Sequence, residues 1–285
     1  MTEVLERNRR VIAVANVKGG VGKTSITANL AAELAAGGYK VLAVDLDPQG
    51  NLRNILGYRD SDIDDAGEGL LRSVTSGDEL HPAKNVRERL DVVAGGIRSK
   101  DLQRELQRAA MDGGDVTTKL ATSLAQISHR YDIVLLDTPP SPGMLQTSAL
   151  VAARYVIIPV EADEDSLDGV ETMAGEIRAV RSRNPLISPL GVVRFRMRQQ
   201  ATRAQAEIAE GITELLGEGV AFDTIVRDAH SVARIGKSQG KIARELGTNP
   251  PSAAGVAADY HHLSREVLTV IQANEEQLAQ KEAQA

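Results

Sequence analysis

A glycine-rich stretch with two lysines, VKGGVGKTS, runs from Val17 to Ser25. It follows an apolar run and precedes a helix-like stretch, and in that setting glycines let backbone N–H groups converge on phosphate oxygens. The helix that follows directs its positive end to the same place. Lys23 is placed to contact the β- and γ-phosphates of a nucleotide, and the Thr24 hydroxyl to bind Mg²⁺. The sequence therefore predicts a nucleotide-binding loop, whose residues are Lys18, Gly19, Gly20, Val21, Gly22, Lys23, Thr24 and Ser25.

Two other apolar runs end in acidic residues. VDLDPQGN (44–51) carries Asp45 and Asp47, and YDIVLLDTPPS (131–141) carries Asp137. In open α/β sheets, ligands bind beyond the carboxyl ends of the strands, so these carboxylates are expected beside the glycine-rich loop. Nucleotide hydrolysis needs such an acceptor to orient the attacking water. Each aspartate alone is compatible with a structural turn, but the combination with the loop favours nucleotide chemistry.

The loop departs from the standard G-x-x-x-x-G-K-[ST] pattern in having Val17 in place of its first glycine and Lys18 directly after it. In this form it resembles the deviant Walker A motif of the ParA/MinD group of P-loop ATPases. The two acidic segments resemble switch I and the Walker B and switch II segment of that family. YVIIPVEADEDSLDG (155–169) resembles the family's next strand and loop, so the resemblance spans about residues 10 to 270.

The resemblance implies ATP and Mg²⁺ as cofactors and an ATP-dependent homodimer. In the family, the early lysine crosses the dimer interface to the phosphates of the other subunit; here that residue is Lys18, although it also fits an ordinary surface cation. The implied catalytic residues are Lys18, Lys23 and Asp47, where Asp47 positions or activates the attacking water. The implied metal-binding residues are Thr24, Asp45 and Asp137, where Asp45 acts through water or supports the metal's shell.

The elements that position these residues follow an alternating pattern. Six apolar, β-branched runs read as strands, at 11–17, 41–47, 90–95, 131–137, 155–160 and 190–195. Strands that are apolar nearly throughout suit a parallel sheet covered by helices on both faces. The fold class is therefore α/β, a three-layer, doubly wound and mainly parallel sheet. We expect a single domain over 1–285, with a short disordered N-terminus (1–9) and a polar C-terminal tail (about 273–285).

Composition excludes some functions that the family includes. The 285 residues contain no cysteine, which removes disulfides, iron–sulfur clusters and the reductase-like branch of the family. No apolar run approaches the roughly 20 residues of a membrane span, so we expect a cytoplasmic protein. The last residues, NEEQLAQKEAQA, have no apolar stripe to insert into a bilayer, so a MinD-like membrane-cycling ATPase is a minor alternative.

Charge is unevenly distributed along the chain. The net charge is −6, but Arg178 to Arg244 holds twelve Lys or Arg against six Asp or Glu. A basic surface of this kind binds duplex DNA through phosphates, without sequence preference. Arg234, Lys237, Lys241 and Arg244 would share one face if that stretch were helical. An ordinary solvated basic face is the alternative; the predicted DNA-binding residues are Arg194, Arg196, Arg198, Arg203, Arg227, Arg234, Lys237 and Lys241.

These features predict a ParA-type partitioning ATPase with weak intrinsic ATP hydrolysis that a partner stimulates. Its ATP-bound dimer is expected to bind DNA without sequence preference and to associate with the nucleoid. A ParB-like centromere-binding protein is the expected partner, in plasmid or chromosome segregation. The alternatives are a same-fold ATPase that positions protein cargo on the nucleoid and, from a different class, a P-loop metabolic kinase or ligase.

Overall fold

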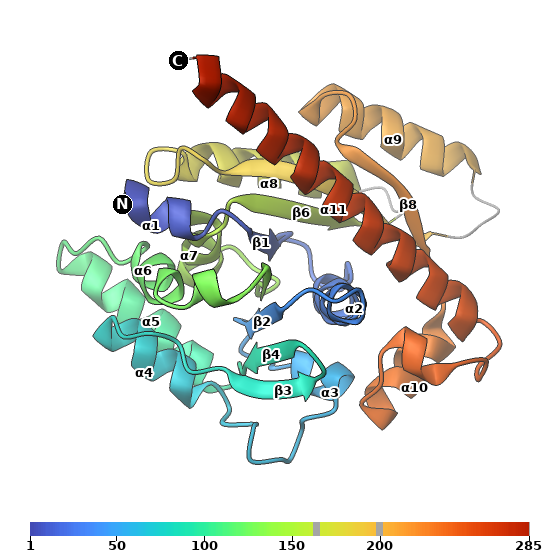
Figure 1. The fold of residues 1–285 in the computed structure, drawn as a ribbon, viewed down its shortest axis with the longest axis horizontal. Coiled ribbons are helices and arrows are strands. Elements are labelled where there is room, and N and C mark those ends of the chain that lie inside the picture. Colours follow the sequence, from blue (N-terminus) through green and yellow to red (C-terminus); the bar gives the residue numbers. More distant parts are fainter. Residues whose placement is uncertain (162–165, 198–201, 285) are drawn as a thin grey trace.

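An eight-stranded sheet forms the centre of the computed structural model, which describes residues 1–161, 166–197 and 202–284 (Figure 1). The strand order is β3-β4-β2-β5-β1-β6-β7-β8, and every pair is parallel except β3 with β4. The strands are β1 (Val11–Val14), β2 (Val41–Asp45), β3 (Ala83–Arg87), β4 (Leu90–Val93), β5 (Ile133–Asp137), β6 (Tyr155–Val160), β7 (Ser188–Met197) and β8 (Ala221–Arg227).

Helices cover both faces of the sheet (Figure 1). Those packed on one face are α2 (Lys23–Ala36), α3 (Leu52–Leu56), α10 (His230–Gln239), the 3₁₀ turn η2 (Ala243–Leu246) and α11 (Ala253–Gln284). Those packed on the other face are α4 (Glu68–Ser76), α5 (Arg98–Met111), α6 (Lys119–Ala125), α7 (Met144–Ala152), α8 (Ser166–Val180) and α9 (Thr202–Leu216). The remaining elements are α1 (Thr2–Arg7) and the 3₁₀ turn η1 (Ser128–Arg130).

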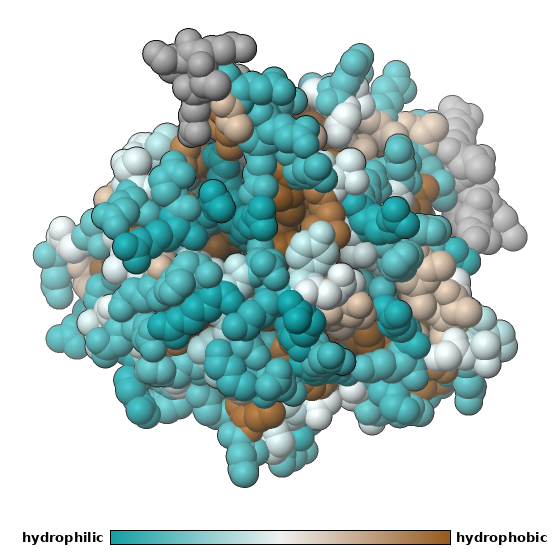
Figure 2. Space-filling view, in the orientation of Figure 1, coloured by the Kyte–Doolittle hydropathy of each residue, from teal (hydrophilic) through white to brown (hydrophobic). Residues whose placement is uncertain are grey.

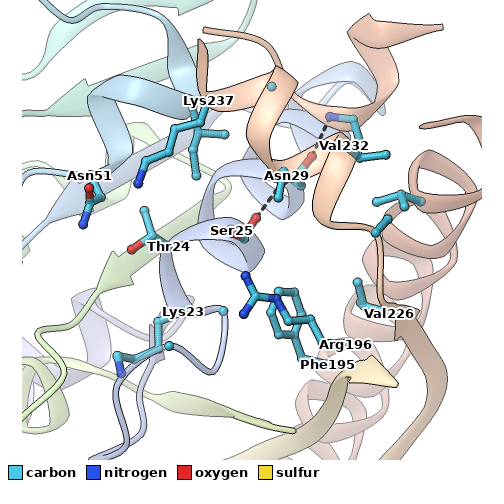
Figure 3. A pocket seen from close by; sticks show the side chains of 18 of the residues that line it. Lys23, Thr24, Ser25, Asn29, Asn51, Phe195, Arg196, Val226, Val232 and Lys237 are labelled. Atoms are coloured by element: carbon cyan, nitrogen blue, oxygen red, sulfur yellow. Dashed lines mark hydrogen bonds between the residues drawn. The ribbon is translucent and has the colours of Figure 1, made fainter. Parts of the chain in front are cut away.

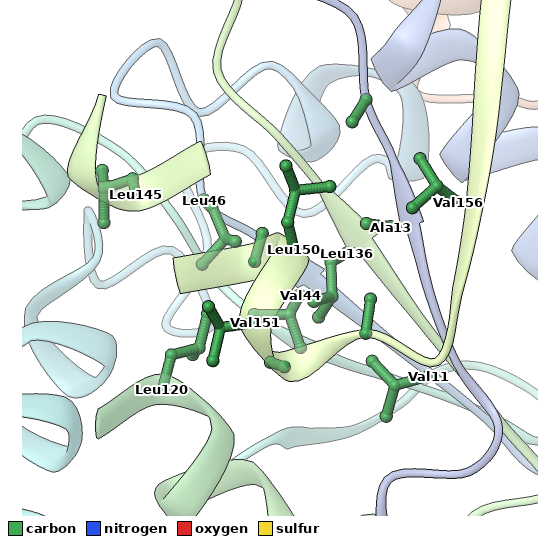
Figure 4. Packing of buried hydrophobic residues seen from close by; sticks show 14 of the residues in the cluster. Val11, Ala13, Val44, Leu46, Leu120, Leu136, Leu145, Leu150, Val151 and Val156 are labelled. Carbon is green, nitrogen blue, oxygen red and sulfur yellow. The ribbon is translucent and has the colours of Figure 1, made fainter. Parts of the chain in front are cut away.

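Two separate hydrophobic clusters, one on each face of the sheet, hold the helices and the sheet together as three layers. Successive residues of β1 alternate between them: Val11 and Ala13 belong to the cluster under α7, and Ile12 and Val14 to the cluster under α2. In the first cluster, α7 lies over β1 and β5 with its leucines and valines directed at the sheet (Figure 4). Because both faces are buried, the central strands are apolar at every position, as the sequence pattern predicted.

The predicted fold class is confirmed, and all six predicted strands are present. Strands β3 and β8 were not predicted; they form the two edges of the sheet, where one side faces solvent and the apolar signal weakens. The prediction of a disordered segment over 1–9 differs from the structure, in which Thr2–Arg7 form α1. Leu5 and Asn8 are buried there, and Asn8 Nδ2 donates to the Ala121 carbonyl, so this segment is anchored to α6.

The surface in the orientation of Figure 1 is mainly hydrophilic, and hydrophobic side chains show only in small areas between polar ones (Figure 2). The predicted polar tail is the last part of α11, which continues as helix to Gln284. None of the helices within the described ranges is long and apolar enough to cross a membrane.

Candidate nucleotide-binding site

The glycine-rich loop connects β1 to the start of α2. Gly22 is the N-cap of α2 and has a φ of 90°, a left-handed conformation that favours glycine. A Cβ at Gly22 would lie 2.3 Å from Cε1 of Phe195, so the ring of Phe195 packs directly against the loop. The N-terminus of this 14-residue helix points its free N–H groups at the place where the loop residues converge. The geometry is that of a phosphate-binding site.

The ammonium group of Lys23 lies inside the loop. Its Nζ donates to the carbonyl oxygens of Asn16 at 2.9 Å and of Lys18 at 2.8 Å. Burial lowers the pKa of Lys23 to about 8, although Asp137 and Asp47 act in the opposite direction. A buried cation held by neutral carbonyls gains more from an anion, so this lysine is suited to receive phosphate oxygens.

Three carboxylates gather at the carboxyl ends of β2 and β5. Asp45 and Asp137 are register partners on these neighbouring strands, and Asp47 follows β2 by two residues. Asp45 accepts hydrogen bonds from the N–H groups of Asp47 at 2.9 Å and Leu52 at 3.2 Å, so its carboxylate organises the segment after β2. Asp47 Oδ1 accepts from the Gln49 N–H at 2.9 Å, and Asp47 lines the cavity described below.

The same crowding shifts the acidity of these groups. Burial raises the pKa of Asp137 to about 7; nearby Asp47 adds to the rise, and a hydrogen bond from the Thr24 side chain opposes it. Burial, together with the charges of Asp137 and Asp47, raises the pKa of Asp45. Burial also raises the pKa of Asp47, against the effect of Lys23. Three neighbouring carboxyl groups with raised pKa values would be stabilised in their charged forms by a cation bound among them.

This set of carboxyl groups fits a divalent cation. Asp137 Oδ2 is buried and has no hydrogen-bond partner among the described residues, so an oxygen ligand is available beside Thr24. No group of three His, Cys, Asp or Glu side chains within the described ranges forms a ready cage for a metal ion. Mg²⁺ does not need such a cage, because it is usually held by one or two carboxylates, waters and the phosphates of the substrate. The residues present therefore fit the predicted Mg²⁺.

A cavity of about 360 Å³ extends from the loop between α3, α10 and the ends of β7 and β8 (Figure 3). Its far wall is apolar and aromatic, and sequence reasoning did not predict it; it includes Ile55, Phe195, Val226, Val232, Val256 and Tyr260. These residues come from five separate elements or loops, so no spacing rule links them. The sequence marks only two of them, Phe195 and Tyr260, because aromatic residues are rare in this chain, which has two Phe and five Tyr. The wall is suited to the base of a nucleotide.

The predicted loop residues divide between this cavity and its surroundings. Gly19, Gly20, Gly22, Lys23, Thr24 and Ser25 line it, together with Asp47 and Pro140. Val21 is buried instead, at 1% exposure. Lys18 does not line the cavity within the described part of the chain; its backbone N–H donates to Asn16 Oδ1 at 3.0 Å.

The predicted DNA-binding residues are dispersed. Arg196, Arg227, Lys237 and Lys241 line the cavity, and Arg227 also pairs with Asp259 through two hydrogen bonds of 2.7 Å. Arg194 donates to the carbonyls of Phe222 and Asp223. Arg203 lies within α9, and Arg198 lies outside the described residues.

The condition for one basic face over residues 234–244, a helix through the whole stretch, is not met. Helix α10 ends at Gln239, because Gly240 adopts a left-handed φ of 63° and stops it. Arg234 and Lys237 therefore share α10, whereas Lys241 follows its end. Arg244 lies in η2 and pairs with Glu33 of α2 at 3.2 Å.

Comparison with known proteins agrees with this site. A family model described as an AAA domain matches residues 9–188. The chromosome-partitioning ATPase Soj of Thermus thermophilus is 33% identical over 276 residues, covering 94% of this chain and 99% of that protein. Apo McdA of Cyanothece has a TM-score of 0.76 at 21% identity, covering 91% of this chain and 99% of that one.

A further solved structure, cobyrinic acid a,c-diamide synthase of Mycobacterium smegmatis with a bound ATP analog and magnesium, has a TM-score of 0.67 at 26% identity. It covers 85% of this chain and 96% of that one. The fold, the loop and the cavity define the class as a P-loop ATPase. Within that class, the chain belongs to the ParA/MinD-type ATPases, the family of Soj.

Proposed function

We propose that this protein is a partitioning ATPase that binds ATP with Mg²⁺, dimerises on ATP and binds duplex DNA without sequence preference. The observation that carries the proposal is one cavity that the loop, with Lys23, and Asp47 line together with an apolar far wall, while Asp45 and Asp137 are buried at the ends of β2 and β5. The loop and Lys23 receive the triphosphate, and the wall receives the base. Mg²⁺, when bound, supplies positive charge that neutralises the phosphates.

The roles of the protein's own residues follow from their positions. Asp47 is the carboxylate that both lines the cavity and lies beyond the end of β2, so it is the residue that orients the attacking water. Asp45 holds the Asp47 and Leu52 N–H groups and so fixes the place of that acceptor. Asp137 and Thr24 provide oxygens on the metal side.

Lys18 is the residue that links the two chains of the proposed dimer. It directly precedes Gly19 and Gly20, which line the cavity, but among the described residues Lys18 itself does not line the cavity of its own chain. A cation so placed is suited to phosphates that a second copy of the chain presents, and ATP then stabilises the assembled state over the separate chains. Hydrolysis removes this stabilisation, and the intrinsic rate is slow because the partner completes the site.

The DNA-binding part of the proposal is supported by the basic composition of residues 178–244 and by exposed Arg234 on α10. The experiment is duplex binding measured with ATP, ADP and no nucleotide over a salt series. We expect binding mainly with ATP, and affinity that falls steeply as salt rises. Arg234→Glu is expected to weaken DNA binding without changing ATP hydrolysis. Arg104→Glu, at an exposed position on α5, is the control charge reversal.

The outcomes separate the classes of function. Affinity that does not change with salt would contradict phosphate contacts. Rapid ATP turnover that needs a small acceptor, without DNA binding in any nucleotide state, would favour a metabolic ligase. A ParB-like protein bound to its DNA site is proposed to raise the hydrolysis rate, which phosphate release measured with and without it tests directly.

A further inference from the structure

Arg196 has an unusual backbone for its position. It lies near the end of β7 with a φ of 53°, in the left-handed region that costs a residue with a Cβ about 1 kcal/mol or more. Of the five non-glycine residues with positive φ within the described ranges, Arg196 is the one that lines the nucleotide cavity. Strain of this kind persists where the surroundings require one side-chain direction, and it concentrates at ligand sites.

The side chain of Arg196 is directed at the loop. Its guanidinium carbon lies 5.4 Å from the ring centroid of Phe195, the ring that packs against Gly22. Figure 3 shows the guanidinium group extending from β7 toward Ser25 at the start of α2. Its NH1 atom also lies 3.3 Å from Oε1 of Glu161, which follows β6. The group is therefore held at the cavity by a stacking surface and a carboxylate, and its side chain is 36% exposed.

A guanidinium in this place is matched to a phosphate. The proposed function places the β- and γ-phosphates at Lys23 and Thr24 and the base at the apolar wall, and the next residue, Ser25, lines the same cavity. The phosphate between those two ends is the one attached to the ribose. Arginine binds phosphate oxygens through two parallel N–H donors, and the two non-bridging oxygens of this phosphate match that pair of donors.

We propose that Arg196 is a nucleotide-binding residue, which exchanges Glu161 for the α-phosphate of ATP or ADP bound in the same subunit. The assignment rests on the proposed function, and it removes this arginine from the DNA-binding set that the sequence predicted. It also gives the strained conformation a reason, because backbone strain of this kind is retained at ligand sites.

Competition against a fluorescent ATP analogue tests the proposal, with ATP, ADP and adenosine as competitors. We expect Arg196→Ala to weaken ATP and ADP by about 10- to 100-fold, by similar factors, and to leave adenosine unchanged. Arg194→Ala is the matched control, because Arg194 lies two residues earlier on β7 and bonds to backbone carbonyls outside the cavity. Glu161→Gln is expected to tighten ATP binding, and this gain is expected to disappear in the Arg196→Ala background.

Two further readouts separate binding from folding. Arg196→Gly removes the same guanidinium but suits the left-handed backbone, so we expect it to have a higher Tm than Arg196→Ala and the same loss of nucleotide affinity. If wild-type protein binds neither ATP nor ADP, the proposed function itself fails. If wild-type protein binds both and Arg196→Ala binds them as tightly, or if Arg196→Ala loses only duplex DNA binding, the assignment of Arg196 is overturned.

Discussion

At the scale of single residues, the site is defined by an imbalance of charge. Lys23 is the buried cation of the loop, and it faces Asp45, Asp47 and Asp137, which are each 6% exposed or less. Burial raises the pKa of all three carboxyl groups, that of Asp137 to about 7 and that of Asp45 well above its ordinary value. A site that is short of positive charge before its ligand arrives favours a nucleotide that brings a metal ion with it.

Asp47 carries the first prediction. Replacing it with alanine removes the acceptor proposed to orient water but leaves the loop and Lys23 intact, so Asp47→Ala is expected to lower the ATP hydrolysis rate by about 100-fold or more. ATP affinity is expected to change little. Phosphate release measures the rate, and competition against a fluorescent ATP analogue measures binding. Normal turnover in this variant would remove Asp47 from its role.

At the scale of elements, α3 and α10 meet at their C-terminal ends. Gly57 caps α3 and Gly240 caps α10, and a Cβ at Gly240 would lie 2.4 Å from the Cα of Gly57. These helices carry Ile55 and Lys237, which line the cavity. The glycine contact therefore fixes one side of the nucleotide site at a distance from the loop.

The second prediction is that Gly240→Ala destabilises the protein by about 1–3 kcal/mol through overpacking and also weakens ATP binding. Gly113→Ala is the matched control, because Gly113 also has a positive φ, of 85°, but a Cβ there meets nothing within 4 Å. Urea unfolding compares the two variants. Equal losses of stability would show that backbone strain, and not the contact with Gly57, decides the effect.

A polar cluster joins the edge hairpin to the sheet and carries the third prediction. Burial acts to raise the pKa of Asp91, but hydrogen bonds from the Asn85 N–H, Tyr131 and Lys84 outweigh it, so its pKa is lowered. The stability that this carboxylate contributes is complete above its ordinary pKa of 3.8 and is lost as the pH falls through its lower native value.

Asp91→Asn is therefore expected to lower the free energy of unfolding at neutral pH by about 1–3 kcal/mol and to flatten its decline in acid. Unfolding measured over a pH series compares it with Asp62→Asn at an exposed site. An unchanged acid profile in Asp91→Asn would mean that other carboxylates set the acid stability.

The sequence predicted the elements whose signal is local. The loop at 17–25, the six buried strands and the three aspartates at strand ends each follow from a short pattern, and the structure brings them together. The apolar wall of the cavity does not follow from any pattern, because Phe195, Val232 and Tyr260 meet only through the order of the sheet and the packing of α10 and α11. Arg234, Lys237, Lys241 and Arg244 do not share one helical face for a local reason, since the left-handed Gly240 ends α10 before Lys241.

At the scale of the whole molecule, the basic segment over residues 178–244 contributes to the nucleotide cavity and carries a proposed DNA contact. Arg196, Arg227, Lys237 and Lys241 line the nucleotide cavity, and the exposed Arg234 lies on the same helix as Lys237. Helix α10 thus carries both a cavity residue and a proposed DNA contact. A shift of α10 on nucleotide exchange would reposition Arg234, which offers a physical route by which ATP controls DNA binding.

The last prediction concerns assembly. Lys18 directly precedes the glycines of the loop, but among the described residues it does not line the cavity of its own chain. Its proposed ligand is therefore the triphosphate bound in a second copy of the chain. Lys18→Ala is expected to abolish ATP-dependent dimerisation while the monomer still binds nucleotide. Light scattering on a sizing column, with ATP, ADP and no nucleotide, measures the assembly, and Lys100→Ala on α5 is the control. If Lys18→Ala dimerises with ATP as the wild type does, the second lysine of the loop does not link nucleotide state to assembly, and another contact must do so.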